Sequence, residues 1–328
     1  MRQTTKNQLF SEADREIFQL LIRHKLEPHT VLAKYSGESV ISTFTRRINN
    51  FCEKYRCSEK IQVLHWDLLG LEPFFLLTDK PFRNPYVIRE YKMLGDGYRY
   101  LTQCVAPNLN IIRGQFRPDE LYPIATVYPP TNDIRLLYKE AHDELTFIDR
   151  WLLNLKEVMV DQELGSVVQY REEIPQSMIE VSNEFLIRLK EIYTRKEPGR
   201  FRQKGRRSKQ IDFIKDLSGF LSVYLDIKIP GMEDYILILK DINNPELFVG
   251  GFLGHFPLLE LYETTNPITL ICRFQIPEQN FTKFHLNLFT HLTLTKACFP
   301  SLWILEEDTR FFHLEEQWDG KRWIPFEL

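Results

Sequence analysis

An internal repeat constrains this chain of 328 residues more than any other feature of its sequence. The strand-like stretch at residues 71–79 has a counterpart at residues 232–240, and residues 84–91 have one at residues 256–262. An arginine pair precedes each copy. Because the period is about 160 to 171 residues, whereas solenoid repeats have periods of about 20 to 50, we expect two similar domains copied in tandem.

The spacing of apolar residues predicts helices near the N-terminus and β-strands in both copies. Between residues 11 and 55 the spacing predicts three short helices, the first capped by Ser11, with breaks at residues 27–28 and 36–37. Strands are expected at residues 61–69, 73–78, 86–94, 98–106 and 122–128, and again at 221–227, 235–239, 258–262, 268–276 and 302–305. Helices are expected at residues 133–160 and 177–196, with Asn132 and Ser177 as caps, and a closing hairpin at residues 311–326.

Charge is distributed unevenly, although the formal net charge is only -3. Residues 1–60 hold eleven Lys and Arg against seven Asp and Glu, and residues 190–209 hold nine against two. Two basic segments in an otherwise acidic chain predict a surface that faces phosphate groups. For residues 190–209 a solvated linker is an equal alternative, because proline and glycine interrupt the stretch.

The five cysteines form no Cys-x-x-Cys pair and are odd in number, which argues against a disulfide framework and against a zinc ribbon. The first residues are polar, and no uncharged run is long enough to cross a membrane. We therefore expect a cytoplasmic protein that binds no membrane and no metal.

Residues 32–41 predict a helix-turn-helix, because the small Ala33 and a turn at Gly37 allow two helices to cross closely. The third helix would then lie in the major groove of double-stranded DNA, with its polar groups on base edges. The expected groove residues are Ser39, Ser42, Thr43, Arg46, Arg47 and Asn50, and Lys34 is expected on a backbone phosphate. A purely structural polar face and a protein-binding face remain alternatives.

Residues 10–21, 32–34, 44–48 and 61–63 resemble, in this order, the DNA-binding half of the leucine-responsive regulatory (Lrp/AsnC) family. Residues 87–101 and 256–266 each resemble part of that family's effector and oligomerisation module. The resemblance covers about two thirds of the chain. It implies a sequence-specific transcription regulator that binds double-stranded DNA and performs no covalent chemistry.

The resemblance implies an α+β fold, in which a winged helix-turn-helix precedes two ferredoxin-like (βαββαβ) sandwich modules joined by a helical and basic connector. The expected domains are residues 1–58 (winged helix-turn-helix), 59–132 (first module), 133–176 (helical connector), 177–218 (degenerate helix-turn-helix with the basic stretch) and 219–328 (second module). Family sandwiches pair between subunits, so the tandem copy is expected to form a pseudo-dimer within one chain. Two chains, as a homodimer, would be needed to recognise a palindrome.

The degenerate helix-turn-helix at residues 177–218 has basic residues where its middle helix and tight turn should be. Its arginines and lysines are expected to neutralise phosphates, which gives affinity without sequence specificity. This second phosphate patch comprises Arg200, Arg202, Lys204, Arg206 and Arg207.

A small-molecule effector is the other partner that the resemblance implies. The family's effector loop corresponds to Gly95, Asp96 and Gly97, where backbone N–H groups and the Asp96 carboxylate could hold a ligand. An ordinary hairpin turn is the alternative interpretation.

None of the eight histidines belongs to a recognisable catalytic or metal-binding motif. We therefore predict that the chain is not an enzyme and needs no cofactor. Two alternatives stay open, a protein-interaction scaffold and an enzyme similar to the siroheme decarboxylases, which resemble Lrp/AsnC proteins and can occur as fused pairs. For that enzyme, the candidate residues around a tetrapyrrole are His65, Arg89, Arg99 and His285.

Overall fold

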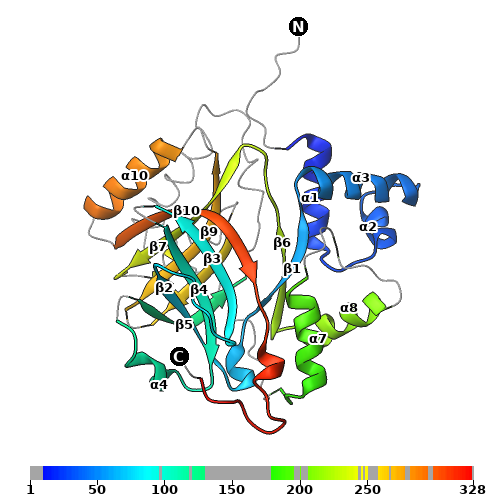
Figure 1. Cartoon of the computed structure of the whole chain (residues 1–328). Coiled ribbons are helices and arrows are strands. Elements are labelled where there is room, and N and C mark those ends of the chain that lie inside the picture. The colour runs from blue at the N-terminus through cyan, green and yellow to red at the C-terminus, as the bar shows by residue number, and fades with distance from the viewer. Residues whose placement is uncertain are drawn as a thin grey trace. The chain divides into compact units, whose positions relative to one another are not determined.

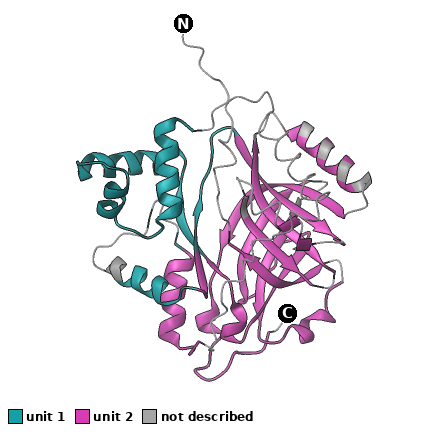
Figure 2. Ribbon diagram, turned by 180° about the vertical axis from the view of Figure 1, so that it is seen from behind, with its two compact units in different colours: residues 1–61, 195–218, 223–231 teal, residues 62–194, 219–222, 232–328 magenta. Residues whose placement is uncertain are grey.

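The computed structural model of the chain forms two compact units (Figure 2). Unit 1 comprises residues 1–61, 195–218 and 223–231, and unit 2 comprises residues 62–194, 219–222 and 232–328. The structure describes residues 10–95, 98–117, 120–129, 179–195, 200, 206–242, 245–246, 248–249, 258–265, 267–277, 281–294 and 298–326. The helix predicted at residues 133–160, its cap Asn132 and the cap Ser177 lie outside these residues.

Unit 1 begins with the three predicted helices, α1 (Glu12–Arg23), α2 (His29–Tyr35) and α3 (Ile41–Lys54) (Figure 1). The Ser11 hydroxyl accepts a hydrogen bond from the backbone N–H of Asp14 at 3.1 Å and so caps α1 as predicted. Phe18 of α1 stacks on Phe51 of α3 with 6.0 Å between ring centroids, and α2 buries Leu32 and Ala33. The apolar spacing thus identified the three helices correctly.

Three further elements follow. Helix α8 (Arg206–Asp216) lies within residues 177–218, where a degenerate helix-turn-helix is expected. Strands β1 (Ser58–Val63) and β6 (Leu221–Asp226) pair as a separate two-stranded sheet. The strand predicted at residues 61–69 ends early, because the 3-10 helix η1 (Trp66–Leu69) follows β1.

Unit 2 contains a closed barrel of antiparallel strands in the order β10-β3-β4-β2-β5-β8-β9-β7 (Figure 1). The first copy of the repeat supplies β2 (Glu72–Thr78), β3 (Val87–Leu94), β4 (Tyr98–Ala106) and β5 (Leu121–Tyr128). The second copy supplies β7 (Met232–Lys240), β8 (Leu258–Thr264), β9 (Thr269–Pro277) and β10 (Phe299–Arg310). The pairing of β7 with β10 closes the ring.

Both copies have the same internal strand order, in which the second, third, first and fourth strands of each copy lie side by side. The fourth strand of each copy pairs with the second strand of the other, as β5 with β8 and β10 with β3. The tandem repeat therefore forms one continuous sheet rather than two separate ones.

The connection from β2 to β3 differs from the βαββαβ prediction. Residues 79–86 contain no helix, because Pro81 and Pro85 each lack a backbone donor and disfavour helical geometry before them. The connection from β4 to β5 holds the short helix α4 (Leu109–Arg113), whereas the connection from β9 to β10 in the second copy holds the longer α10 (Phe281–Leu294). The prediction of a helix between the first two strands is thus wrong for the first copy, at residues 79–86.

Alternating side chains of the barrel strands enter two different cores. Ile236 and Ile238 of β7 belong to an apolar cluster shared by both copies of the repeat. Tyr235, Leu237 and Leu239 pack with apolar residues of α10 in a second cluster. Because both faces of β7 are buried at residues 235–239, this part of the strand is a continuous apolar run rather than an alternating one.

The remaining described elements lie in unit 2. Helix α7 (Asn183–Tyr193) is capped by Ser182, whose hydroxyl accepts from the Phe185 N–H at 3.2 Å. The predicted final hairpin is reduced to one bridge between Trp318 and Trp323, and the 3-10 helix η4 (Leu314–Glu316) precedes it. In the part of the chain that the structure describes, no helix has the length and apolar character needed to cross a bilayer.

Candidate functional site

The outer face of α3 and of the turn before it holds most of the predicted groove residues. Phe44, Ile48 and Phe51 form the buried stripe of the helix, and its exposed side carries several of the predicted residues. The exposed residues are Lys34, Ser39, Ser42, Thr43, Arg46 and Asn50. Of these, Lys34 belongs to α2, and we name the other five, which lie on α3 and the turn before it, the α3 face.

Arg47 is the exception among the predicted groove residues, because it is half-buried and engaged within unit 1. Its guanidinium group donates to Glu16 of α1 at 3.0 Å and also to Glu38 in the turn before α3. Burial lowers the pKa of Arg47, but the hydrogen bonds that Arg47 donates to the two carboxylates outweigh this effect and raise the pKa overall. Arg47 therefore fixes α3 against α1 rather than reaching outward.

Arg200 does not lie on a phosphate-facing surface, since only 6% of the residue is exposed. Its Nε donates to Glu59 at 2.8 Å, and its other nitrogens donate to the backbone carbonyls of Glu27 at 2.8 Å and His24 at 3.3 Å. This arginine therefore joins the second basic stretch to the first helices within unit 1. Its predicted role in the phosphate patch is replaced by a structural one.

The other members of the predicted second patch are placed less fully. Arg202 and Lys204 lie outside the described residues, whereas Arg206 and Arg207 begin α8. By sequence, the segments of unit 1 hold 21 Lys and Arg against 11 Asp and Glu, a formal charge of +10, which leaves -13 for unit 2. The two basic segments that are distant in sequence thus belong to one compact unit.

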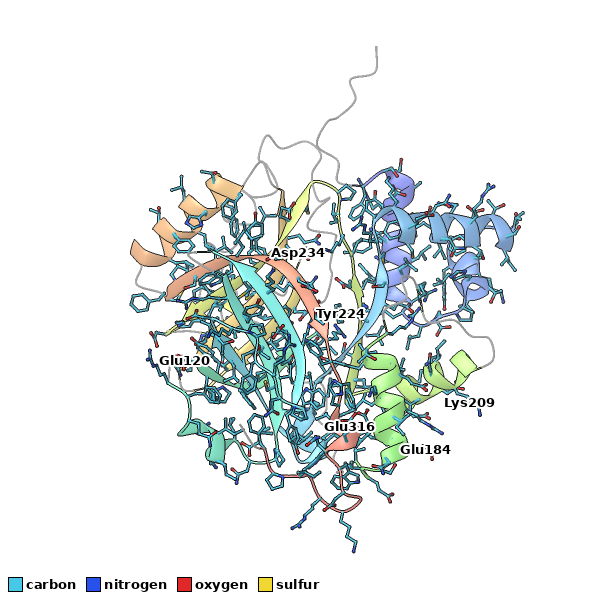
Figure 3. All side chains as sticks on the ribbon, in the orientation of Figure 1. Glu120, Glu184, Lys209, Tyr224, Asp234 and Glu316 are labelled. Carbon is cyan, nitrogen blue, oxygen red and sulfur yellow. The ribbon has the colours of Figure 1, made fainter. Side chains whose placement is uncertain are left out.

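A buried ion-pair network links the two copies of the repeat in unit 2. The Arg89 guanidinium donates to both oxygens of Glu260 and to both oxygens of Asp308, each at 2.6 Å. Arg273 donates to Glu260 at 3.1 Å, to Asp308 at 3.0 Å and to Asp234 at 2.9 Å. Figure 3 labels Asp234 on β7. Each carboxylate of the network is thus held by at least one guanidinium group.

Two tyrosines complete the network, since Tyr91 and Tyr262 donate to Glu260 at 2.6 and 2.9 Å. Burial alone would raise the pKa values of Glu260 and Asp308, but Arg89 and Arg273 lower both, so the carboxylates stay ionised. In the repeat alignment Arg89 corresponds to Glu260 and Tyr91 to Tyr262. An arginine and a glutamate at equivalent strand positions of the two copies were a sequence signal for an ion pair between the copies. Sequence reasoning did not use this signal.

The four residues expected around a tetrapyrrole have different partners. Arg89 is part of the ion-pair network, and His65 precedes η1, with Nδ1 3.8 Å from the Asp67 carboxylate. The Arg99 guanidinium lies 5.5 Å from the Trp303 ring, and the His285 ring stacks on Phe289 with 4.3 Å between centroids. The contacts described here do not bring the four side chains into one site.

The predicted effector loop lies at the turn from β3 to β4, where only Gly95 is described. A Cβ atom on Gly95 would lie 2.1 Å from a ring carbon of Trp303. Glycine is therefore required here by the close approach of an aromatic ring, whatever the loop binds. Asp96 and Gly97 lie outside the described residues. Among the residues that are described, no cluster of His, Cys, Asp or Glu could hold a metal ion.

No protein-family model and no curated protein matches the chain. Among solved structures, it is similar to siroheme decarboxylase NirDL, with 14% sequence identity over 93% of this chain and 96% of the other. The TM-score is 0.45, and it is 0.44 for the co-complex of NirDL with an iron-uroporphyrin III analogue. The likeness concerns the mixed α/β fold, and no residue of this chain takes a role from it. The prediction that the chain is not an enzyme is contradicted, because both structures are of an enzyme, and it is not retained.

Proposed function

We propose that the chain binds double-stranded DNA through the α3 face, as a regulator of Lrp/AsnC type whose winged helix-turn-helix precedes the tandem repeat in sequence. The observation that supports this proposal is the exposure of Ser42, Thr43, Arg46 and Asn50 along one side of a helix whose opposite side is buried. The formal charge of +10 on the segments of unit 1 favours a polyanionic partner.

The chemistry of the α3 face suits base-edge recognition. An arginine can donate two hydrogen bonds to guanine, and an asparagine can both donate to and accept from adenine. Arg46 and Asn50 lie four residues apart, so they share one side of α3 about one turn from each other. Hydroxyl groups of Ser42 and Thr43 can contact bases or phosphates beside them. Arg47 is engaged by Glu16 and Glu38 within unit 1, so Arg46 is the arginine expected to contact base edges.

The test is a mobility-shift titration of the parent protein, Arg46→Ala and Asn50→Ala with promoter DNA from the source genome. Each substitution should weaken specific binding by about 1 to 3 kcal/mol, which is the usual value of a good base contact. Arg322→Ala is the matched control, because this arginine has an 85% exposed side chain in the acidic unit 2. Parent-like binding by both α3 variants would refute the proposal.

A tetrapyrrole-binding enzyme is the second candidate function. It is favoured by the Arg99 guanidinium beside the flat Trp303 ring, because a guanidinium group can bind a tetrapyrrole carboxylate while an aromatic ring packs on the macrocycle. The Trp303 Nε1 donor is buried without a hydrogen-bond partner among the described residues. Titration with siroheme should then shift its visible absorption spectrum, and Arg99→Ala should weaken the shift. An unchanged spectrum would exclude this candidate.

A further inference from the structure

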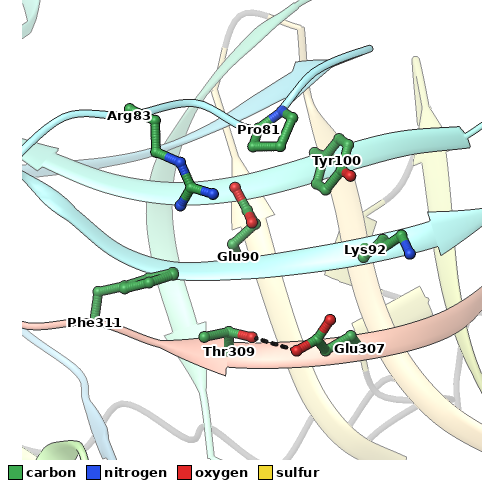
Figure 4. A pocket seen from close by; sticks show the side chains of 8 residues that line it. All are labelled: Pro81, Arg83, Glu90, Lys92, Tyr100, Glu307, Thr309 and Phe311. Atoms are coloured by element: carbon green, nitrogen blue, oxygen red, sulfur yellow. Dashed lines mark hydrogen bonds between the residues drawn. The ribbon is translucent and has the colours of Figure 1, made fainter.

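A pocket of about 390 Å³ lies on three neighbouring strands of unit 2 (Figure 4). Glu90 and Lys92 come from β3, Tyr100 from β4, and Glu307 and Thr309 from β10. Pro81, Arg83 and Phe311 complete its lining. These β3 side chains alternate with Arg89 and Tyr91, so the pocket is on the sheet face opposite to the ion-pair network. It also lies where strands from the two copies of the repeat pair.

Glu90 is the most deeply buried charged residue among those that line the pocket. It is only 9% exposed, and its Oε2 atom is buried without a hydrogen-bond partner in the described part of the chain. Unsatisfied buried polar atoms are uncommon in proteins, so the Glu90 acceptor in the pocket lining indicates a position where a ligand group could donate a hydrogen bond.

The surrounding charges favour a cation as that group. Burial raises the pKa of Glu90, and the neighbouring Glu307 raises it further. The charge of Arg83 and the hydrogen bond from the Phe82 N–H lower it, but by less. The Lys92 ammonium pairs with Glu306 at 3.0 Å and so is already engaged by another carboxylate. The pocket thus presents two carboxylates and one exposed arginine, Arg83.

The pocket also has rings that suit an organic cation. Tyr100 and Phe311 line it, and Figure 4 shows the Glu90 carboxylate between Arg83 and Tyr100 with no hydrogen bond drawn to either. The negative faces of aromatic rings attract ammonium groups and pack against their carbon atoms. A neutral or anionic ligand would leave the Glu90 acceptor without a charged donor.

We propose that this pocket binds a small organic amine in its protonated form, with the ammonium group donating to Glu90 Oε2 and the organic part beside Tyr100 and Phe311. Glu307 adds a second negative charge, and Thr309, which donates to Glu307 at 3.2 Å, holds that carboxylate. The site belongs entirely to unit 2 and does not depend on DNA binding by unit 1.

The experiment is a calorimetric or NMR titration of the full chain with benzylamine at pH 7, compared with benzyl alcohol and benzoate. Saturable binding of benzylamine, with weaker binding of the two uncharged or anionic probes, is the expected result. Benzoate binding as tightly as benzylamine, or no saturable benzylamine binding, would overturn the proposal.

Variants show whether binding occurs at this pocket. Glu90→Gln keeps the shape of the side chain and should weaken benzylamine binding about tenfold or more, because a charge-assisted hydrogen bond is lost. Glu307→Gln should weaken it a few-fold, and Glu316→Gln, with a 64% exposed side chain away from the pocket, is the control. If Glu90→Gln fails to fold, Glu307→Gln decides, and parent-like affinity in that variant would refute the site.

Discussion

Single residues of this chain show how a local charge pattern can be misleading about exposure. Arg200 lies in a stretch rich in basic residues and interrupted by proline and glycine, which normally indicates a solvated segment. The structure buries it because Glu59 on β1 is fully buried and needs a cation. The pattern along the chain cannot reveal this partner, which is 141 residues away in sequence.

Arg200→Ala should destabilise unit 1 rather than selectively remove a DNA contact. It removes the cation paired with the buried Glu59, and breaking such a pair typically costs about 3 to 5 kcal/mol of unfolding free energy. Urea unfolding measures this cost, with Arg322→Ala as a surface control that should change stability little. Parent stability combined with weaker DNA binding would restore Arg200 to the phosphate patch.

Asp308 should determine how unit 2 responds to acid. Although burial opposes it, Arg89 and Arg273 lower the pKa of Asp308 in the folded state, so this group stabilises the fold fully above its unfolded pKa of about 4. The contribution is lost as the pH falls through the lower, folded pKa. Asp308→Asn should therefore lower the unfolding free energy at pH 7 and flatten its fall below about pH 4.

Urea unfolding between pH 2 and 7 measures this dependence on pH. Asp67→Asn, on a carboxylate with a 69% exposed side chain, provides the control. The same acid dependence in Asp308→Asn as in the parent protein would show that the network does not govern acid stability.

At the scale of elements, the turn between β3 and β4 is defined by packing. Gly95→Ala would place a Cβ atom 2.1 Å from the Trp303 ring, so the ring or the turn must move. Overpacking of this kind typically costs about 1 to 3 kcal/mol of unfolding free energy. Trp303→Leu should remove most of that added cost, which a double-mutant cycle measures. Gly114→Ala is the matched control, because nothing lies within 4 Å of its Cβ position, and an equal effect of both substitutions would contradict this explanation.

Sequence reasoning located most elements and missed how some of them connect. The helical spacing from residue 11 to 55 identified α1, α2 and α3, since each buries a single apolar stripe. The strand positions also followed from apolar runs between turn residues. The family pattern suggested a helix after β2, whereas the prolines at 81 and 85 already argued against one. The α3 face could be predicted because its residues are local, but the pocket at Glu90 could not, since three strands build it.

For unit 2 as a whole, the central fact is that neither copy of the repeat completes its own sheet. The repeat predicted two similar sets of strands and a pseudo-dimer, but a tandem pattern does not specify which strand edges meet. The structure joins β5 to β8 and β10 to β3, pairs that are far apart in sequence. Each copy alone would therefore expose two strand edges, and closure of the barrel removes both.

This closure predicts that the two copies unfold together. Arg89 of the first copy pairs with Glu260 and Asp308 of the second, and Arg273 also holds Asp308. Separating the two copies would therefore also separate buried charges. Native-state hydrogen exchange should give the same opening free energy for the slowest amides of β4, in the first copy, and β9, in the second. Arg89→Met should lower both values together, because the lost ion pairs belong to both copies. Different opening energies for the two strands in the parent protein, or a loss confined to β4 in the variant, would mean that the copies are stable independently and that the barrel is not one cooperative structure.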